Sequence, residues 1–255
     1  MKKIIIIMIS VVIIWGVSGC MNQNELKDAI DGLSGYINKS TNDAAEAVTR
    51  ELELKYGCQF EIKKTGGRID SDSVAFNLSP KDDSSVVFKA SINTKSGNIT
   101  DNYIGKNIAA GFVRDFENNL AEYGIRGAVS AAFTHQDDAN EDDIQISAEE
   151  YFEKYKVSSS LVYLALDNST VNSDSAENLI KVCRAMGTEY GITIAVNGVV
   201  LSDRFSACAS DMKSEPDVSA TWFDVYSPIS SYHFAVSNGD SNISKEELKK
   251  ILAGD

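Results

Sequence analysis

The chain has 255 residues, of which 43% are hydrophobic and 24% are charged, with 37 acidic against 24 basic side chains. This composition is typical of a globular protein and excludes a chain that is disordered throughout. The formal net charge of −13 excludes DNA, RNA and anionic lipid head groups as broad electrostatic partners, because like charges repel.

The N-terminus carries a pattern typical of export and membrane anchoring. Two lysines precede an apolar run over 4–17, which is too short to span a bilayer of about 30 Å but has the length of a signal-peptide core. The run ends in Val17-Ser18-Gly19-Cys20, which resembles the lipobox of bacterial lipoproteins. The resemblance implies a cleaved signal peptide over 1–19 and a diacylglycerol on Cys20. That lipid would hold the mature chain on a cell membrane, facing away from the cytoplasm.

The first part of the mature chain predicts a tether and then an α+β unit. Residues 20–40 are polar with weak helical spacing, and a helix over about 41–57 presents apolar residues every four positions. Three alternating runs then predict an antiparallel meander, with Gly66-Gly67 as its first turn. A helix over about 102–123 follows, so that 41–125 forms one unit.

Residues 126–255 also contain predicted strands and helices, but in another order, and form either a second α+β unit or a continuation of the first. Asn197-Gly198, between two β-branched runs, predicts a hairpin with a tight turn. The other predicted elements are strands at 128–134, 161–166, 222–226 and 232–236, a loop over 209–217, a helix over about 175–190, and helices opened by Ser147 and Ser244. The expected fold class is therefore α+β, with antiparallel sheets and packed helices.

An acidic loop offers candidate metal ligands. Five acidic side chains lie within 136–143, and Asp138, Asn140, Asp142 and Glu149 fall at offsets 1, 3, 5 and 12 of a calcium-binding loop. The pattern over 137–149 resembles a degenerate EF-hand, because an aspartate stands at offset 6 in place of glycine. A weaker echo of the same loop ends the chain, with Asn238, Asp240, Ile243 and Glu247 at offsets 3, 5, 8 and 12. The alternative at both places is a solvated loop before a capped helix, and the residues favour it.

Catalytic motifs are absent from the sequence. It contains no Gly-x-Ser-x-Gly elbow, His-Glu-x-x-His motif or Walker loop. A Ser/His/Asp site that uses His135 or His233 remains an alternative, because serines are plentiful. An aromatic stretch around Pro228 is either core or a surface for sugar rings or peptide, with core favoured: Trp222, Phe223, Tyr226 and Tyr232.

Three cysteines follow Cys20. Cys183 and Cys208 are a possible disulfide outside the membrane, whereas Cys58 begins an alternating run and is expected to be a buried small hydrophobe.

Two short segments resemble uncharacterised lipoproteins of Gram-positive bacteria, a resemblance that carries no known activity: Lys55-Tyr56-Gly57 before an alternating strand, and Thr100-Asp101-Asn102-Tyr103 opening a helix. The sequence thus predicts a membrane-anchored extracytoplasmic lipoprotein. We expect it to act as a non-catalytic binding or interaction module without a cofactor, with an envelope protein or a glycan as its partner. The alternatives are a calcium-binding envelope protein and an envelope hydrolase.

Overall fold

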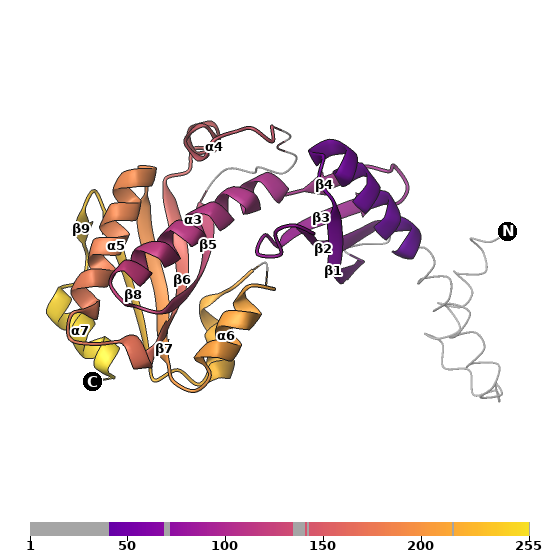
Figure 1. Ribbon diagram of the computed structural model, residues 1–255. Coiled ribbons are helices and arrows are strands. Elements are labelled where there is room, and N and C mark those ends of the chain that lie inside the picture. Colours follow the sequence, from indigo (N-terminus) through magenta and orange to yellow (C-terminus); the bar gives the residue numbers. More distant parts are fainter. Residues whose placement is uncertain (1–40, 69–71, 135–140, 142, 216, 255) are drawn as a thin grey trace, which may run out of the picture. The chain divides into compact units, whose positions relative to one another are not determined.

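The computed structural model describes residues 41–68, 72–134, 141, 143–215 and 217–254 (Figure 1). From Ala44 onward the chain forms one compact unit. The predicted signal peptide, the lipidation site Cys20 and the tether over 20–40 lie outside the described residues. Within the described ranges, no helix combines the length and the apolar character that crossing a membrane requires.

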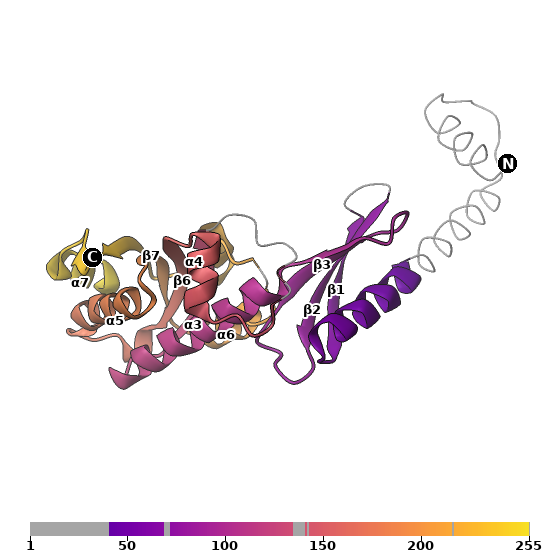
Figure 2. The ribbon, with the colours of Figure 1, turned by 90° about the horizontal axis from the view of Figure 1, so that it is seen from above.

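The first sheet is the antiparallel meander that the alternating runs predict. Its apolar residues share a buried core with Ala44, Val48 and Leu52 of the helix over 41–56, which runs alongside the sheet in Figure 2. The predicted turn at Gly66-Gly67 is wrong, because both glycines lie inside the first strand, where its register with the next strand shifts. In chain order the strands are β1 (Phe60–Arg68), β2 (Ser73–Pro80), β3 (Phe88–Asn93) and β4 (Ile99–Asp101).

The second sheet has five strands in the order β5-β6-β7-β8-β9, with bounds of Gly127–Thr134, Ser159–Asp167, Thr193–Leu201, Ser230–Ser237 and Asp240–Ser241. β6 and β7 run parallel, whereas the other neighbouring pairs are antiparallel as predicted. Adjacent parallel strands need a crossover. The short 3-10 helix η1 (Asn168–Thr170) and the helix α5 (Ser175–Tyr190) provide it.

Helices cover both faces of the second sheet. Side chains alternate between the two faces along β5. Val129 and Ala131 belong to the core under α3, whereas Ala128 belongs to the core under α6. One face carries α3 (Tyr103–Glu122), α5 and α7 (Lys245–Ala253), and the other carries α6 (Phe205–Met212) and the 3-10 helix η2 (Ala220–Tyr226) (Figure 1).

Two predicted helix starts are confirmed by their caps. Ser147 and Glu150 form a reciprocal capping box that opens α4 (Ala148–Tyr155). The Ser244 side chain accepts a hydrogen bond from the Glu247 N–H and opens α7. Short-range polar contacts of this kind can be predicted from sequence, because both partners lie within one turn of the helix.

The predicted hairpin at Asn197-Gly198 is wrong. β7 passes through both residues without turning, and Gly198 does not have a positive φ. It lies opposite Tyr232 of β8, and a Cβ added at Gly198 would lie 2.1 Å from Tyr232 Cζ. Glycine is therefore required here by the close approach of a ring, and a sequence pattern cannot distinguish that requirement from a turn.

Two further predictions near the C-terminal half of this sheet are wrong. Residues 222–226 form part of η2 and not a strand, and the predicted loop over 209–217 begins inside α6. Both helices are short and bury only a few apolar side chains, so their periodicity is weak. The aromatic stretch is nevertheless mainly core, as favoured: Phe223, Tyr226 and Tyr232 are buried, and Trp222 is half-buried.

The possible disulfide between Cys183 and Cys208 is absent, and all three cysteines of the described residues are free. Cys183 packs in the core on one face of the second sheet and Cys208 in the core on the other, so the sheet separates them. Burial raises the pKa of both thiols, that of Cys208 to about 12. Cys58 is half-buried, and its sulfur lies 3.9 Å from the Tyr103 hydroxyl.

Replacing Gly198 by alanine tests the close packing against Tyr232. Because the ring is buried and the added Cβ would overlap it, Gly198→Ala should lower the free energy of unfolding by about 1–3 kcal/mol. Gly111→Ala is the matched control, since its Cβ would meet only Arg114 Nη2, at 3.9 Å. Alanine inside α3 should raise stability by about 0.5–1 kcal/mol. Urea unfolding measures both, and an unchanged midpoint for Gly198→Ala would contradict the packing argument.

Candidate functional site

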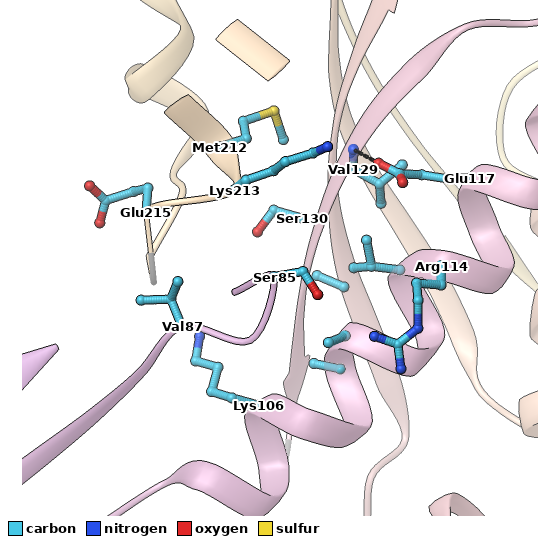
Figure 3. A pocket seen from close by; sticks show the side chains of 14 residues that line it. Ser85, Val87, Lys106, Arg114, Glu117, Val129, Ser130, Met212, Lys213 and Glu215 are labelled. Carbon is cyan, nitrogen blue, oxygen red and sulfur yellow. Dashed lines mark hydrogen bonds between the residues drawn. The ribbon is translucent and has the colours of Figure 1, made fainter. Parts of the chain in front are cut away.

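The candidate site is a pocket of about 270 Å³ beside β5, at the edge of the second sheet (Figure 3). Its walls come from α3, from β5, from the segment that follows α6, and from Ser85 and Val87 before β3. Because α3 and α6 cover opposite faces of the sheet, the pocket lies where the two helical layers part.

The outer edge of β5 faces this pocket. β5 is a terminal strand, and among the described residues no strand pairs with its outer edge. The Val129 N–H donates a hydrogen bond to Glu117 Oε1 at 3.1 Å and so points away from β6. In an antiparallel pair the direction of the backbone groups alternates. The N–H and C=O groups of Ala131 and Phe133 therefore also point outward, since the register with β6 is unbroken.

A smaller pocket of about 140 Å³ continues along the same edge. The two pockets share Lys106 and Ala109 of α3 and Ala131 of β5. Small α3 residues, Gly105, Ala109 and Ala110, leave the space open beside the strand. Together the two pockets form one groove, which we call the β5 groove, running along the strand from Val129 to Phe133.

Glu117 on α3 is the polar group nearest to the strand at one end of the β5 groove. Its side chain is half-buried, and burial raises the pKa of the Glu117 carboxyl. The hydrogen bond from Val129 and the charge of Lys213 act in the opposite direction but more weakly. Figure 3 shows the Lys213 side chain reaching across the pocket toward Glu117.

The other cations of the groove have carboxylate partners. Arg114 Nη1 lies 3.2 Å from Asp83 Oδ2, and Lys106 Nζ lies 3.7 Å from Asp217 Oδ1. Among the described residues, neither Glu117 nor Lys213 forms an ion pair within 4 Å. Together with Glu215, these two side chains are therefore the groove charges most available to a ligand.

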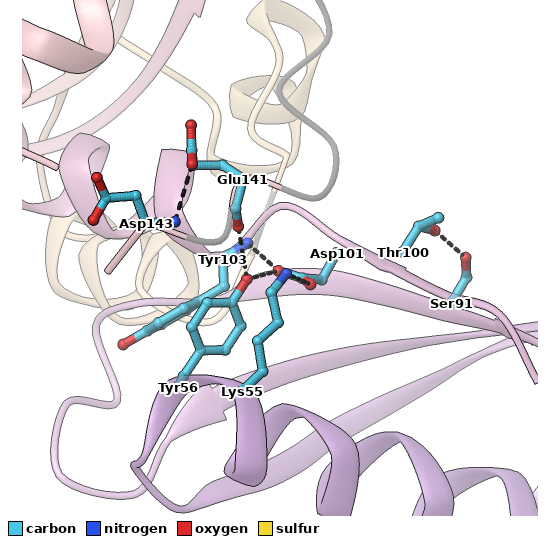
Figure 4. A network of polar contacts seen from close by, with 8 residues as sticks. All are labelled: Lys55, Tyr56, Ser91, Thr100, Asp101, Tyr103, Glu141 and Asp143. Carbon is cyan, nitrogen blue, oxygen red and sulfur yellow. Dashed lines mark hydrogen bonds and ion pairs between the residues drawn. The ribbon is translucent and has the colours of Figure 1, made fainter. Parts of the chain in front are cut away.

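A second polar cluster surrounds Asp101, which is 5% exposed at the end of β4 (Figure 4). Its carboxylate accepts hydrogen bonds from the Tyr56 hydroxyl at 2.7 Å and the Tyr103 N–H at 3.0 Å, and Lys55 Nζ lies 3.1 Å away. Both carboxylate oxygens are thus occupied. The cluster joins the end of the helix over 41–56 to the start of α3 and acts as a structural crosslink.

The predicted calcium site is mostly outside the described residues, since Asp138, Asn140 and Asp142 cannot be placed. Glu149 is exposed in the first turn of α4. Glu141, from the same acidic loop, is 4% exposed and is neutralised by Lys154 Nζ at 2.6 Å. The described ranges contain no group of three or more histidine, cysteine or acidic side chains arranged to hold a metal.

The remaining predicted site residues do not gather in the structure. His135 lies outside the described residues, and His233 is exposed on β8, away from the lining of the β5 groove. In the C-terminal echo of the calcium loop, the segment after β8 makes a tight hairpin into β9 and Ser244 caps α7.

No motif in the sequence indicates Glu117, Lys213 or the unpaired edge of β5. The one available signal was the run of small residues in the predicted strand, Gly127-Ala-Val-Ser-Ala-Ala, which leaves room beside the backbone. The terminal position of the strand depends on the order of all five strands, and no local pattern encodes it.

No protein-family model matches the chain, and a search of curated proteins also gives no match. Among solved structures, the chain is similar to a DUF5037 family protein from Ruminococcus gnavus ATCC 29149. The TM-score is 0.63 at 15% sequence identity, and the likeness covers 82% of this chain and 98% of that chain. At this identity the comparison shows the fold alone, and it agrees with the predicted α+β class.

The raised pKa of Glu117 predicts how stability depends on pH. Folding favours the protonated carboxyl, so the stability it contributes is complete below the unfolded pKa and is lost as pH rises through the folded pKa. Glu117→Gln carries no charge and keeps an acceptor for Val129. Between about pH 4 and 7 the wild type should therefore lose stability relative to Glu117→Gln. Thermal unfolding across this range measures the difference, and parallel profiles would contradict it.

Proposed function

We propose that the chain is an extracytoplasmic interaction module, held at a cell membrane through a lipid on Cys20, whose β5 groove binds an extended segment of an envelope protein. The segment would add to the second sheet as a further strand beside β5. The observation that carries this proposal is the outer edge of β5, which meets no other strand among the described residues.

The edge of β5 lacks the features that usually protect a sheet edge. Proteins commonly block edges with very short strands, prolines, lysines or bulges. β5 has eight residues, contains no proline and no charged side chain, and pairs with β6 without a register shift. At the other side of the sheet, β9 has only two residues. Glu117 occupies one outward N–H, that of Val129, and among the described residues no strand pairs with the part of the edge that follows.

The groove also has room for the side chains of an added strand. Successive side chains of a strand point to opposite faces. One set would lie against the small residues of α3, and the other against Met212 and the segment that follows it. Backbone hydrogen bonds would give affinity and the two walls would give selectivity, as in other cases of strand addition.

The two alternative functions gain no support from the described residues. Among the described residues, the lining of the β5 groove includes Ser85 and Ser130 but no histidine, so it does not bring a serine together with a predicted catalytic histidine. Calcium binding stays a prediction, because three of the four expected ligands lie outside the described residues.

A displayed random library of 12-residue peptides, selected on the detergent-solubilised full chain, tests strand addition. Selected peptides should lose affinity about tenfold or more when alternate backbone amides, those that face β5, are N-methylated. Ala131→Pro should lower the affinity of the peptides by a similar factor, because it removes an outward N–H without removing a hydrogen bond to β6. Isothermal calorimetry measures both effects, and thermal unfolding checks that the variant is folded.

The matched control is built into the peptide. Moving each methyl group by one residue places it on an amide that faces away from β5, and affinity should then be unchanged. Failure to select any peptide, or selected peptides that tolerate both methylation patterns and the Ala131→Pro change, would contradict strand addition.

Membrane attachment has a separate test. In cells that export the chain, Cys20→Ala should move it from the membrane fraction to the soluble fraction or leave it unprocessed, because the thiol that accepts the lipid is gone. Cys58→Ala, which keeps Cys20, should stay in the membrane fraction. Continued incorporation of labelled fatty acid into Cys20→Ala would refute the assignment.

A further inference from the structure

We propose that the strand added to β5 carries a lysine or arginine side chain that enters the β5 groove at its Val129 end and pairs with Glu117. The inference rests on the proposed function of the groove and specifies the chemistry of the partner.

Glu117 is placed where a side chain of the added strand would pass. Its Oε1 binds the outward N–H of Val129, so the carboxylate lies on the line along which the new strand would run. The structure gives Glu117 Oε2 no hydrogen-bond donor among the described residues. This oxygen is therefore free to accept a hydrogen bond from a cationic group.

The partial burial of Glu117 and the charge of the whole chain favour a cation. The lining of the groove itself has three basic and three acidic side chains. Arg114 is paired with Asp83, and Lys89 and Lys106 share Asp217. The formal net charge of the whole chain is −13, which also draws basic segments toward it. A half-buried carboxylate interacts with an incoming cation more strongly than an exposed one does.

In the free protein Lys213 reaches toward the place of the partner's cation, but among the described residues it forms no ion pair within 4 Å. It is exposed, extends from the segment after α6, and is the cation whose charge acts on Glu117. A long exposed side chain can move aside at low cost, so a better-placed cation on the added strand would replace it. Removing Lys213 should therefore strengthen binding of a basic peptide.

Protonation of Glu117 should weaken the same interaction. The other charged groups of the same pocket are Arg114 and Lys106 on α3 and Lys213 and Glu215 after α6, while β5 contributes only uncharged residues. The basic groups stay charged in acid. Binding of a basic peptide should therefore fall as pH drops through the raised pKa of Glu117.

The test compares selections from the same peptide library on the full-length wild type, Glu117→Gln and Lys213→Ala. On the wild type, lysine or arginine should be enriched at one position, and replacing that residue by glutamine should lower affinity about tenfold. In Glu117→Gln the replacement should change affinity less than twofold. Lys213→Ala should bind the basic peptide several times more tightly. Glu122→Gln, an exposed glutamate of α3 outside the groove lining, is the control and should behave like the wild type.

The outcomes separate this inference from the proposed function. Peptides that require the Ala131 N–H but show no basic preference, or keep that preference in Glu117→Gln, would overturn the inference and leave strand addition standing. A preference for acidic residues would do the same. Peptides that bind without the Ala131 N–H, or the absence of any binder, would overturn both.

Discussion

A backbone N–H or C=O group at the edge of a sheet lacks the partner that a neighbouring strand provides, and among the described residues no strand pairs with the outward groups of Ala131 and Phe133 in β5. The second sheet is arranged around this edge. α5 connects the parallel neighbours β6 and β7. β5 pairs with the other side of β6 and is therefore the terminal strand of the sheet. α3 and α6 then cover opposite faces and part beside β5. The β5 groove is thus formed by the strand order and by the placement of these two helices.

The groove is formed before any partner binds. α3 supplies one wall, and its start is held by the Asp101 cluster, in which the Tyr103 N–H donates to a buried carboxylate. Phe112, Phe116 and Leu120 fix the rest of the helix in the core. A wall fixed in this way loses little conformational freedom on binding, which favours affinity. Glu117, on the same helix, is thereby held at the edge of β5.

Much of the fold could be predicted from local patterns, whereas the site could not. Ser147 and Ser244 mark helix starts because their partners lie within one turn, and alternation identifies β5 and β6 as strands. The Asn-Gly pattern wrongly predicts a turn at Gly198, because glycine is required there by Tyr232, a residue distant in sequence. Strand order and the parallel pair are likewise long-range properties. Glu117 gains its importance only from the terminal position of β5, so no motif indicates it.

Amide hydrogen exchange, measured residue by residue with and without a selected peptide, tests strand addition most directly. We expect the amides of Ala131 and Phe133 to exchange at least about tenfold more slowly in the complex, because the added strand supplies their missing acceptors. Ser130 and Ala132, whose amides already face β6, should hardly change. Peptide binding that leaves the exchange of Ala131 and Phe133 unaltered would contradict the account.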